Sequence, residues 1–176
     1  MVQNEVLQAI QSRASVKGFQ PTPVPEADLQ AIVEAGLRAP SGLNKQSPII
    51  LVVTDPATVK ELSALNAGKD PFFRADPFYG APAVLIVLAD KSVPTYLYDG
   101  SLVMGNMLLA AHAIGLGACW IHRAKEEFES EAGKAILKKL GIEGDFEGIG
   151  NCVVGYPKGE LPKVKPCKEG RVYYIK

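Results

Sequence analysis

Hydrophobic residues recur along the chain at two different spacings, and each spacing predicts a different kind of secondary structure. Apolar residues three and four positions apart, such as Leu29, Ile32 and Val33, are typical of a helix with one buried face. Uninterrupted apolar runs, such as residues 83–88, predict strands that are covered on both faces. On this basis the predicted helices are residues 4–13, 26–38, 59–65, 100–114 and 129–140. The predicted strands are residues 48–53, 83–88, 118–121 and 149–156, followed by an extended segment at 171–175.

The alternation of helices and strands predicts an α/β or α+β fold with three layers. The 176 residues suit one domain spanning 1–176, because a chain of this length can bury a core without disulfides or a metal. The apolar helix at 100–114 lies either at the centre of the core or in an interface with another chain. The segment at 171–175 follows the last predicted strand and needs the sheet edge of a partner.

The charge of the chain narrows the classes of partner. Nineteen Lys and Arg residues balance nineteen Asp and Glu residues, which argues against a nucleic-acid partner for the surface as a whole. The residues from 158 onward are an exception, because they include six cations and only two carboxylates, a local net charge of +4. Such a run is either a solvated tail or a segment that binds a phosphate.

The cysteines and the apolar segments indicate a cytoplasmic chain. Cys119, Cys152 and Cys167 are odd in number and form no Cys-x-x-Cys pair, as expected of a reduced protein. The first ten residues lack the basic and apolar regions of a signal peptide. The longest apolar stretch, residues 101–116, contains polar residues and is shorter than the roughly 20 residues that span a membrane. No membrane segment is therefore predicted.

A polar loop is predicted between the second predicted helix and the first predicted strand. Pro40 ends the helix, and Gly42 relaxes the steric limits on the backbone. Ser41, Asn44 and Gln46 place three neutral hydrogen-bonding side chains within six residues. The loop is either an ordinary connector or a surface for a ligand that is polar along one edge and flat elsewhere.

Three polar side chains follow the first predicted helix at alternate positions. Arg13, Ser15 and Lys17 face the same side if this segment is extended, so they can converge on one ligand. An Arg fork and a Ser hydroxyl suit a phosphate, and a Lys suits a point negative charge. Alternatively, the cations only complement the dipole at the end of the helix.

The motifs of several other enzyme classes are missing from the sequence. Gly115 and Gly117 follow a helix and precede a strand, the reverse of the order in a dinucleotide-binding glycine loop. The sequence contains no Walker A, H-E-x-x-H or G-x-S-x-G motif, and no Cys/His cluster with the spacing of metal ligands. No metal site is predicted, and His112 is assigned to the apolar helix as a satisfied histidine rather than a catalyst.

Four motifs spread along the chain are informative when they are taken together. They are Arg13-x-Ser15-x-Lys17-x-Phe19, Ala39-Pro40-Ser41-Gly42-x-Asn44-x-Gln46, residues 106–121, and Val153-Val154-Gly155-Tyr156-Pro157. Together they resemble the signature of the FMN-dependent nitroreductase family over nearly the whole chain. The resemblance implies an α+β fold of three layers, in which helices flank a central mixed, mostly antiparallel sheet. It also implies a homodimer that exchanges its C-terminal strands and holds FMN at the subunit interface.

The resemblance further implies which residues of this chain contact FMN. Arg13 and Ser15 are expected at the phosphate and ribityl chain, with Lys17 toward the pyrimidine edge of the flavin. Asn66 and Lys69 fall where the family often contacts the pyrimidine ring. These five residues are expected to belong to the subunit that holds most of the flavin.

By the same resemblance, the polar loop reaches the flavin of the partner subunit. Pro40, Ser41 and Asn44 are the expected contacts, and Gln46 completes the loop motif. The site would then form only in a homodimer, and the loop would be one wall of it rather than an ordinary connector.

The backbone and the basic tail supply the remaining contacts that the resemblance implies. The backbone near His122 and Arg123 is expected to face N5 and O4 of the flavin, where hydride is exchanged. Lys163 and Lys165 are expected to close on the phosphate. Many short members of the family have an Arg where this chain has Cys167, so this tail lacks one guanidinium of the family's pattern.

The resemblance implies an oxidoreductase that uses NADH or NADPH. The nicotinamide reduces FMN and is replaced by a small acceptor, such as a nitroaromatic or a quinone. No catalytic acid or base is expected among the side chains, because hydride transfer takes place at the flavin. The alternatives are other FMN chemistry on the same fold, such as reductive dehalogenation or azoline oxidation, and a flavin-binding or storage protein without catalysis.

Overall fold

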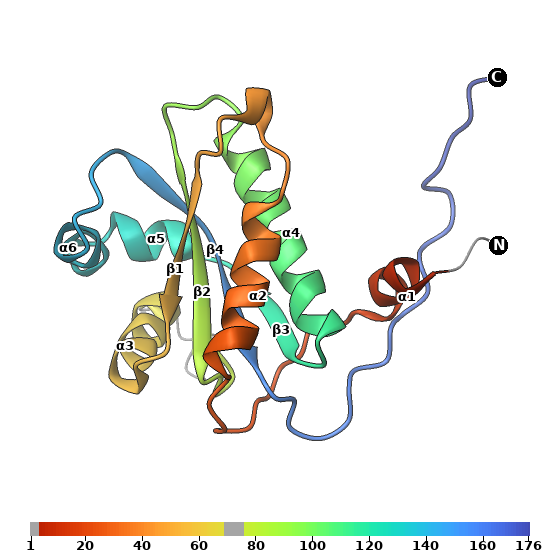
Figure 1. The fold of residues 1–176 in the computed structure, drawn as a ribbon, viewed down its shortest axis with the longest axis horizontal. Helices are drawn as coiled ribbons and strands as arrows, with labels where there is room; N and C mark the ends of the chain where they lie inside the picture. Colours follow the sequence, from red (N-terminus) through yellow and green to blue (C-terminus); the bar gives the residue numbers. More distant parts are fainter. Residues whose placement is uncertain (1–3, 69–75) are drawn as a thin grey trace.

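The computed structural model describes residues 4–68 and 76–176, which form helices and strands around one sheet (Figure 1). The helices are α1 (Glu5–Ser12), α2 (Glu26–Leu37), α3 (Pro56–Ala67), α4 (Tyr96–Ala113), α5 (Ala124–Glu129) and α6 (Glu131–Lys139), with a short 3-10 helix η1 (Gly42–Asn44). The strands are β1 (Pro48–Val53), β2 (Ala83–Asp90), β3 (Gly117–Ile121) and β4 (Phe146–Gly155).

The four strands form one sheet in the order β1-β2-β4-β3, and each neighbouring pair is antiparallel. α2 and α4 cover one face of the sheet, and α3, α5 and α6 cover the other (Figure 1). Alternate residues of β2 therefore enter different cores, with Leu85 packed in the α2/α4 core and Ile86 in the α3/α5 core. The three-layer α+β fold predicted from the sequence is confirmed.

The segment after α1 lies along the edge of β3. Ser15 forms a parallel bridge with Ala118, and the Val16 N–H donates to the Ala118 carbonyl at 3.0 Å. A Cβ added to Gly117 would lie 2.9 Å from a methyl carbon of Val16, so the absent side chain at Gly117 allows this close approach. The segment therefore occupies one edge of the sheet.

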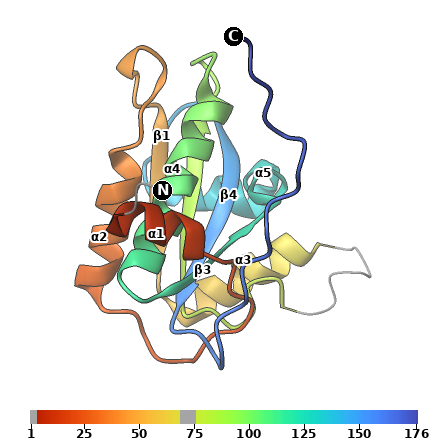
Figure 2. The same ribbon diagram turned by 90° about the vertical axis from the view of Figure 1, so that its right-hand side faces the viewer.

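α1 itself lies against α4, as Figure 2 shows. The Ser12 hydroxyl and His112 Nε2 form a hydrogen bond of 2.8 Å between the two helices. His112 is half-buried, so its assignment as a satisfied histidine of the apolar helix agrees with the structure.

The outer edge of β1 has no strand beside it within the described ranges 4–68 and 76–176. The tail from residue 158 to the end is exposed, and it runs on the side of the molecule opposite β1 (Figures 1 and 2). The extended segment predicted at 171–175 therefore pairs with no strand of its own chain. Within the described residues, no helix is both long enough and apolar enough to cross a membrane.

Two helices begin earlier than predicted, and one of the two begins at a side-chain cap. The helix predicted at 59–65 spans Pro56–Ala67, since the Asp55 carboxylate accepts from the Thr58 N–H at 2.8 Å and caps the helix earlier. The helix predicted at 100–114 spans Tyr96–Ala113 without a side-chain cap at Thr95, and Asp99 lies buried in its first turn.

The helix predicted at 129–140 corresponds to α6, and a short helix that was not predicted, α5, precedes it at Ala124–Glu129. Ser130 is extended, with ψ of 158°, and its hydroxyl accepts from the Gly133 N–H at 3.1 Å to cap α6. A Cβ added to Gly133 would lie 2.2 Å from the Glu127 carbonyl oxygen. The two helices therefore meet at a sharp bend that only glycine accommodates, and no period in the hydrophobic pattern signals this bend.

Candidate functional site

Arg13, Ser15 and Lys17 gather around the thiol of Cys119 on β3. Burial raises the pKa of this thiol, whereas a hydrogen bond with Ser15 and the positive charges of Lys17 and Arg13 act against the rise. The three side chains therefore all lie near enough to Cys119 to act on its thiol. The interpretation of this segment as extended, with alternate residues converging, agrees with this arrangement.

The three side chains are partly or fully exposed, and the start of the tail borders the other side of their segment, at Ala14 and Val16. Ser15 and Lys17 are exposed, and Arg13 is half-buried. A small cavity is lined by residues of α1, α4, β3, the 13–17 segment and the tail, namely Ser12, Ala14, Val16, Leu108, His112, Leu116, Ala118, Leu161 and Pro162. Because Leu161 and Pro162 border this cavity, the exposed Lys163 and Lys165 follow directly after the point where the tail meets the segment.

The turn between β3 and α5 has a fixed backbone conformation. Arg123 has a φ of 76°, in the left-handed region that is uncommon for residues other than glycine. The His122 carbonyl accepts a hydrogen bond of 2.6 Å from the Asn66 side chain. The Arg123 guanidinium donates to the Ala67 carbonyl at 3.3 Å, and its Nε lies 4.0 Å from a carboxylate oxygen of Glu126. The C-terminal end of α3 thus holds this turn.

Asn66 is buried, and its amide nitrogen donates to both the His122 carbonyl and the Glu127 carboxyl group. The amide expected near the flavin pyrimidine is therefore engaged within the protein, and its contact with flavin stays a prediction. Lys69, the other residue expected there, lies outside the described residues.

Glu127 and Asn151 form a buried polar pair behind this turn. The Asn151 amide donates to Glu127 Oε1 at 2.8 Å. Burial raises the pKa of Glu127 to about 7, against the hydrogen bonds from Asn66 and Asn151 that lower it. Neither residue stands out in the sequence. The only local signal is that Glu127 lies beside Ala124 and Phe128 on what becomes the buried face of α5.

The polar side chains of the 40–46 loop bond to one another. The Ser41 hydroxyl accepts from the Gln46 N–H at 2.9 Å, and the Gln46 side-chain amide donates to Asn44 Oδ1 at 3.0 Å. Leu43, Asn44 and Gln46 have φ values of 50°, 54° and 49°. Such conformations cost roughly 1 kcal/mol or more per residue, so the hydrogen bonds impose a shape that the backbone does not prefer.

Asp99 connects this loop to α4. Its carboxylate accepts from the Gly42 N–H at 3.0 Å and from the Thr95 hydroxyl at 2.9 Å. A Cβ added to Gly42 would lie 2.3 Å from the Thr95 hydroxyl oxygen, so glycine is required for this approach. Asp99 is therefore a positioning residue for the loop, a role that no spacing in the sequence indicates.

The 40–46 loop and the 13–17 segment lie at different ends of the chain's fold. The loop projects beyond one end of α4, whereas the segment passes near the other end beside β3 (Figures 1 and 2). One chain therefore does not bring these two predicted groups of site residues together.

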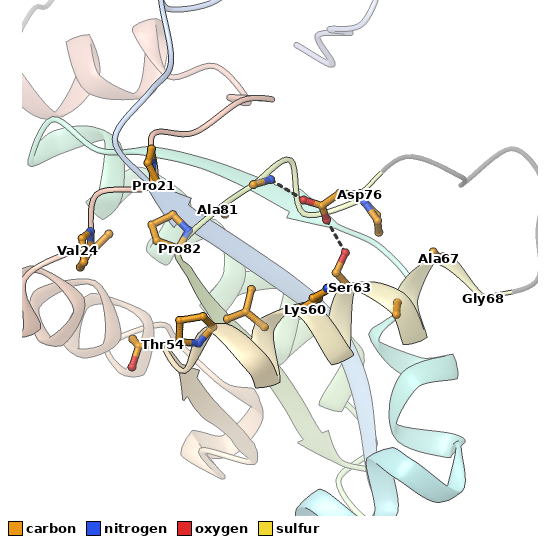
Figure 3. A pocket seen from close by; sticks show the side chains of 16 residues that line it. Pro21, Val24, Thr54, Lys60, Ser63, Ala67, Gly68, Asp76, Ala81 and Pro82 are labelled. Carbon is orange, nitrogen blue, oxygen red and sulfur yellow. Dashed lines mark hydrogen bonds between the residues drawn. The ribbon is translucent and has the colours of Figure 1, made fainter.

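Two large cavities lie elsewhere. The cavity in Figure 3, of about 830 Å³, lies between α3 and the segments 21–24 and 76–82, and the Asp76 carboxylate on its wall bonds to Ser63. A groove of about 850 Å³ runs along β1 between α3 and α6. Neither is lined by Arg13, Ser15 or Lys17.

A family model described as the nitroreductase family matches residues 10–156. The chain belongs to the nitroreductase family. A relative from Archaeoglobus fulgidus, with the provisional name NADH dehydrogenase/NAD(P)H nitroreductase, is 30% identical over 161 residues, covering 89% of this chain and 87% of the relative. An NADPH-flavin oxidoreductase of Vibrio harveyi is 26% identical over 173 residues, covering 93% of this chain and 70% of that protein.

The fold of this nitroreductase-family chain is shared with solved structures. A crystal structure of a nitroreductase with bound FMN from Bacteroides fragilis has a TM-score of 0.90 and 29% identity. The match covers 99% of this chain and 100% of the other. The family suggested by the four sequence motifs is therefore confirmed.

We expect Asp99→Ala to lower the free energy of unfolding by about 2 kcal/mol, because the Gly42 N–H and the Thr95 hydroxyl both lose their acceptor. Urea denaturation measures this loss, and amide hydrogen exchange at Gly42 should accelerate. Asp99→Asn is the matched control, because its amide oxygen still accepts from the Gly42 N–H. This variant should lose less than half of the free energy of unfolding that Asp99→Ala loses. Slow exchange at Gly42 in Asp99→Ala would contradict the assigned role.

Proposed function

We propose that this protein is an FMN-dependent oxidoreductase that transfers electrons from NADH or NADPH to a small nitroaromatic or quinone-like acceptor. The observation that carries the proposal is the convergence of Arg13, Ser15 and Lys17 beside β3, the strand that leads into the fixed turn at Arg123. Family membership supports it, as do the bound FMN named for the Bacteroides fragilis structure and the NADPH-flavin oxidoreductase activity named for the Vibrio harveyi relative.

The donors of the 13–17 segment fit the phosphate end of FMN. The phosphate carries roughly two negative charges and three acceptor oxygens. Arg13 offers a planar fork of N–H groups, Ser15 a hydroxyl, and Lys17 a compact cation. Lys17 Nζ lies 6.0 Å from the centre of the Tyr79 ring, so an aromatic face is available on the same side. The neighbouring tail adds Lys163 and Lys165 to the positive field.

The turn at His122 and Arg123 fits the polar edge of the flavin ring. Bound FMN supplies the centre that accepts and gives up hydride. The chain supplies backbone dipoles of fixed direction, because Asn66 holds the His122 carbonyl and Ala67 holds the Arg123 guanidinium. Dipoles that do not reorient during a reaction stabilise developing charge more effectively than mobile ones. The proposal therefore needs no catalytic side-chain acid or base.

A homodimer is part of the proposal because one chain does not bring both groups of site residues together. The 40–46 loop, which contains Pro40, Ser41 and Asn44, lies far from the 13–17 segment of its own chain (Figure 1). Leu43 beside them is 93% exposed and is therefore available for contact with a second subunit. In the proposed dimer, the loop of one subunit covers the flavin that the partner subunit holds.

We also propose that the C-terminal segment of each subunit adds a strand to β1 of the other. The β1 edge has unpaired backbone groups available, since no described strand lies beside it. The groove of about 850 Å³ includes residues of β1 in its lining. Val172, Tyr173, Tyr174 and Ile175 are exposed residues of high β propensity, and strand addition would pair their backbone with β1.

The three cysteines support a reducing compartment. Cys119, Cys152 and Cys167 are all free thiols, and the first two are buried. We therefore retain the cytoplasm as the proposed location.

We expect the purified protein to bind FMN with a flavin visible spectrum, and anaerobic NADH or NADPH to bleach it. A nitroaromatic or a quinone should then restore the oxidised spectrum. Arg13→Ala should raise the dissociation constant for FMN at least about tenfold, because the charge-assisted bonds to the phosphate are lost. Fluorescence titration with FMN measures this constant.

Lys134→Ala, which removes an exposed cation of α6, is the matched control and should leave FMN binding unchanged. Arg13→Lys should retain part of the affinity. A wild-type protein that binds no FMN would overturn the proposed function. A protein that binds FMN but oxidises neither nicotinamide would instead favour flavin binding without catalysis.

A mixed dimer of Arg13→Ala and Asn44→Ala subunits tests the shared site. Each homodimer should bind FMN weakly. If Asn44 serves the flavin held by the partner's Arg13 segment, the mixed dimer has one doubly altered site and one intact site. It should therefore bind about one FMN per dimer with wild-type affinity. If both residues serve the same chain's site, no intact site exists and the mixed dimer stays weak.

Removal of residues 171–176 tests the exchanged strand. We expect the dimer dissociation constant to rise at least about tenfold, measured by light scattering over a dilution series, because the added strand is lost from β1. Arg171→Ala keeps the apolar residues of the segment and should dimerise as the full chain does. An unchanged dimer after the truncation would exclude strand exchange.

A further inference from the structure

A cluster of three polar side chains lies in the interior between α3, α5 and β4. Asn66, Glu127 and Asn151 are 2%, 1% and 0% exposed, respectively. Each comes from a different element, so the cluster joins α3, α5 and β4 at one point. A carboxyl group at this depth is costly unless it is neutral or fully hydrogen-bonded.

The hydrogen bonds of this cluster are unevenly distributed. Glu127 Oε1 accepts from the amide nitrogens of both Asn66 and Asn151, the latter at 2.8 Å. Glu127 Oε2 and Asn151 Oδ1 are also buried, and neither has a hydrogen-bond partner among the described residues. Both are acceptors when the carboxyl group is ionised, so two adjacent groups each leave one acceptor unsatisfied.

We propose that Glu127 is held as a neutral carboxylic acid that donates from Oε2 to Asn151 Oδ1, and that the resulting acid–amide pair positions the β3–α5 turn. A planar acid and a planar amide joined by one N–H···O bond can close a ring through a second, O–H···O bond. A single proton on Glu127 therefore satisfies both unpaired atoms. No other protonation change in the cluster does so, because neither Asn side chain titrates.

The surroundings of Glu127 favour the neutral form. Burial is the main cause that raises its pKa, to about 7. Of the charged groups that act on it, Glu126 on the same helix raises the pKa further and Arg123 of the turn lowers it. α3 and β4 face the carboxyl group with the uncharged amides of Asn66 and Asn151. A pKa of about 7 keeps Glu127 neutral below that pH and ionised above it.

The pair acts on the proposed flavin site through Asn66. The Asn66 amide nitrogen bonds to Glu127 Oε1 and to the His122 carbonyl, so the position of the acid fixes that carbonyl in the turn. Ionisation places two unpaired acceptors against each other and adds a buried negative charge behind the turn. Glu127 is thus a positioning residue, and this part of the inference rests on the proposed FMN function.

The protonation state is tested on the protein without flavin. At about pH 6, infrared spectroscopy should show the carbonyl stretch of a protonated carboxylic acid, which disappears as the pH rises through about 7. Glu127→Gln should lack this band and remain folded, because its amide N–H replaces the acid proton toward Asn151. Glu129→Gln removes an exposed carboxylate of the same helix and should retain the band. A wild-type spectrum without the band would overturn the inference.

Stability gives a second measurement. With a folded-state pKa of about 7 and an ordinary value near 4.5 in the unfolded chain, Glu127 binds a proton only in the folded state between these values. Its contribution to stability is complete below about pH 4.5 and is lost as the pH rises through about 7. In this window the unfolding constant of the wild type relative to Glu127→Gln should rise by up to about tenfold per pH unit. A constant ratio would count against a neutral Glu127.

The positioning role is tested by FMN affinity across the same pH range. The ratio of the wild-type dissociation constant to that of Glu127→Gln should rise at least about threefold between about pH 6 and pH 8.5. A threefold rise is expected if FMN binding raises the pKa of Glu127 by about half a unit. Titration of the FMN phosphate affects both proteins equally and cancels in the ratio.

The outcomes separate the two proposals. A protein that shows the acid band but binds no FMN retains the acid–amide pair and overturns the proposed function. A protein that binds FMN with the same pH dependence in both variants overturns the positioning role of Glu127.

Discussion

The candidate site depends on one backbone pairing, the hydrogen bond from the Val16 N–H to the Ala118 carbonyl at the edge of β3. Side chains alternate along an extended segment, so this pairing places Arg13, Ser15 and Lys17 on one side and Val16 on the other. Val16 is buried against Gly117. A slip of one residue would expose Val16 and bury the polar side chains, which is energetically prohibitive. The burial of one valine therefore determines where the cations of the site lie.

The same strand connects the two ends of the proposed site. β3 begins beside the 13–17 segment and ends at the turn formed by His122 and Arg123, and it pairs along its length with the buried strand β4. The turn is held from α3 by Asn66 and from behind by Glu127 and Asn151. A rigid sheet thus sets the separation between the cations and the turn, and the polar cluster sets the orientation of the turn.

Local sequence patterns predict the parts of this molecule whose partners are close in the chain. The strand at 48–53 is predicted with the bounds that the structure shows, because an uninterrupted apolar run bounded by turn residues is a local signal. The role of Asp99 depends on Gly42, which is 57 residues away, and Glu127 depends on Asn66 at a separation of 61. No local period encodes such contacts. The proposed contact between the loop and the 13–17 segment is harder still to predict from local patterns, because it requires a second chain.

The 40–46 loop shows why a shared site suits this fold. Three of its residues other than glycine adopt left-handed conformations, each at a cost of roughly 1 kcal/mol or more. The bonds that hold them, from Gln46 to Ser41 and Asn44, each return about 1 kcal/mol, and Asp99 contributes a charge-assisted bond through Gly42. The cost of the backbone strain and the gain from the hydrogen bonds nearly cancel, so the loop adds little to the stability of its own chain. The shape of the loop therefore matters more for the proposed contact with the flavin of the partner subunit than for the stability of its own chain.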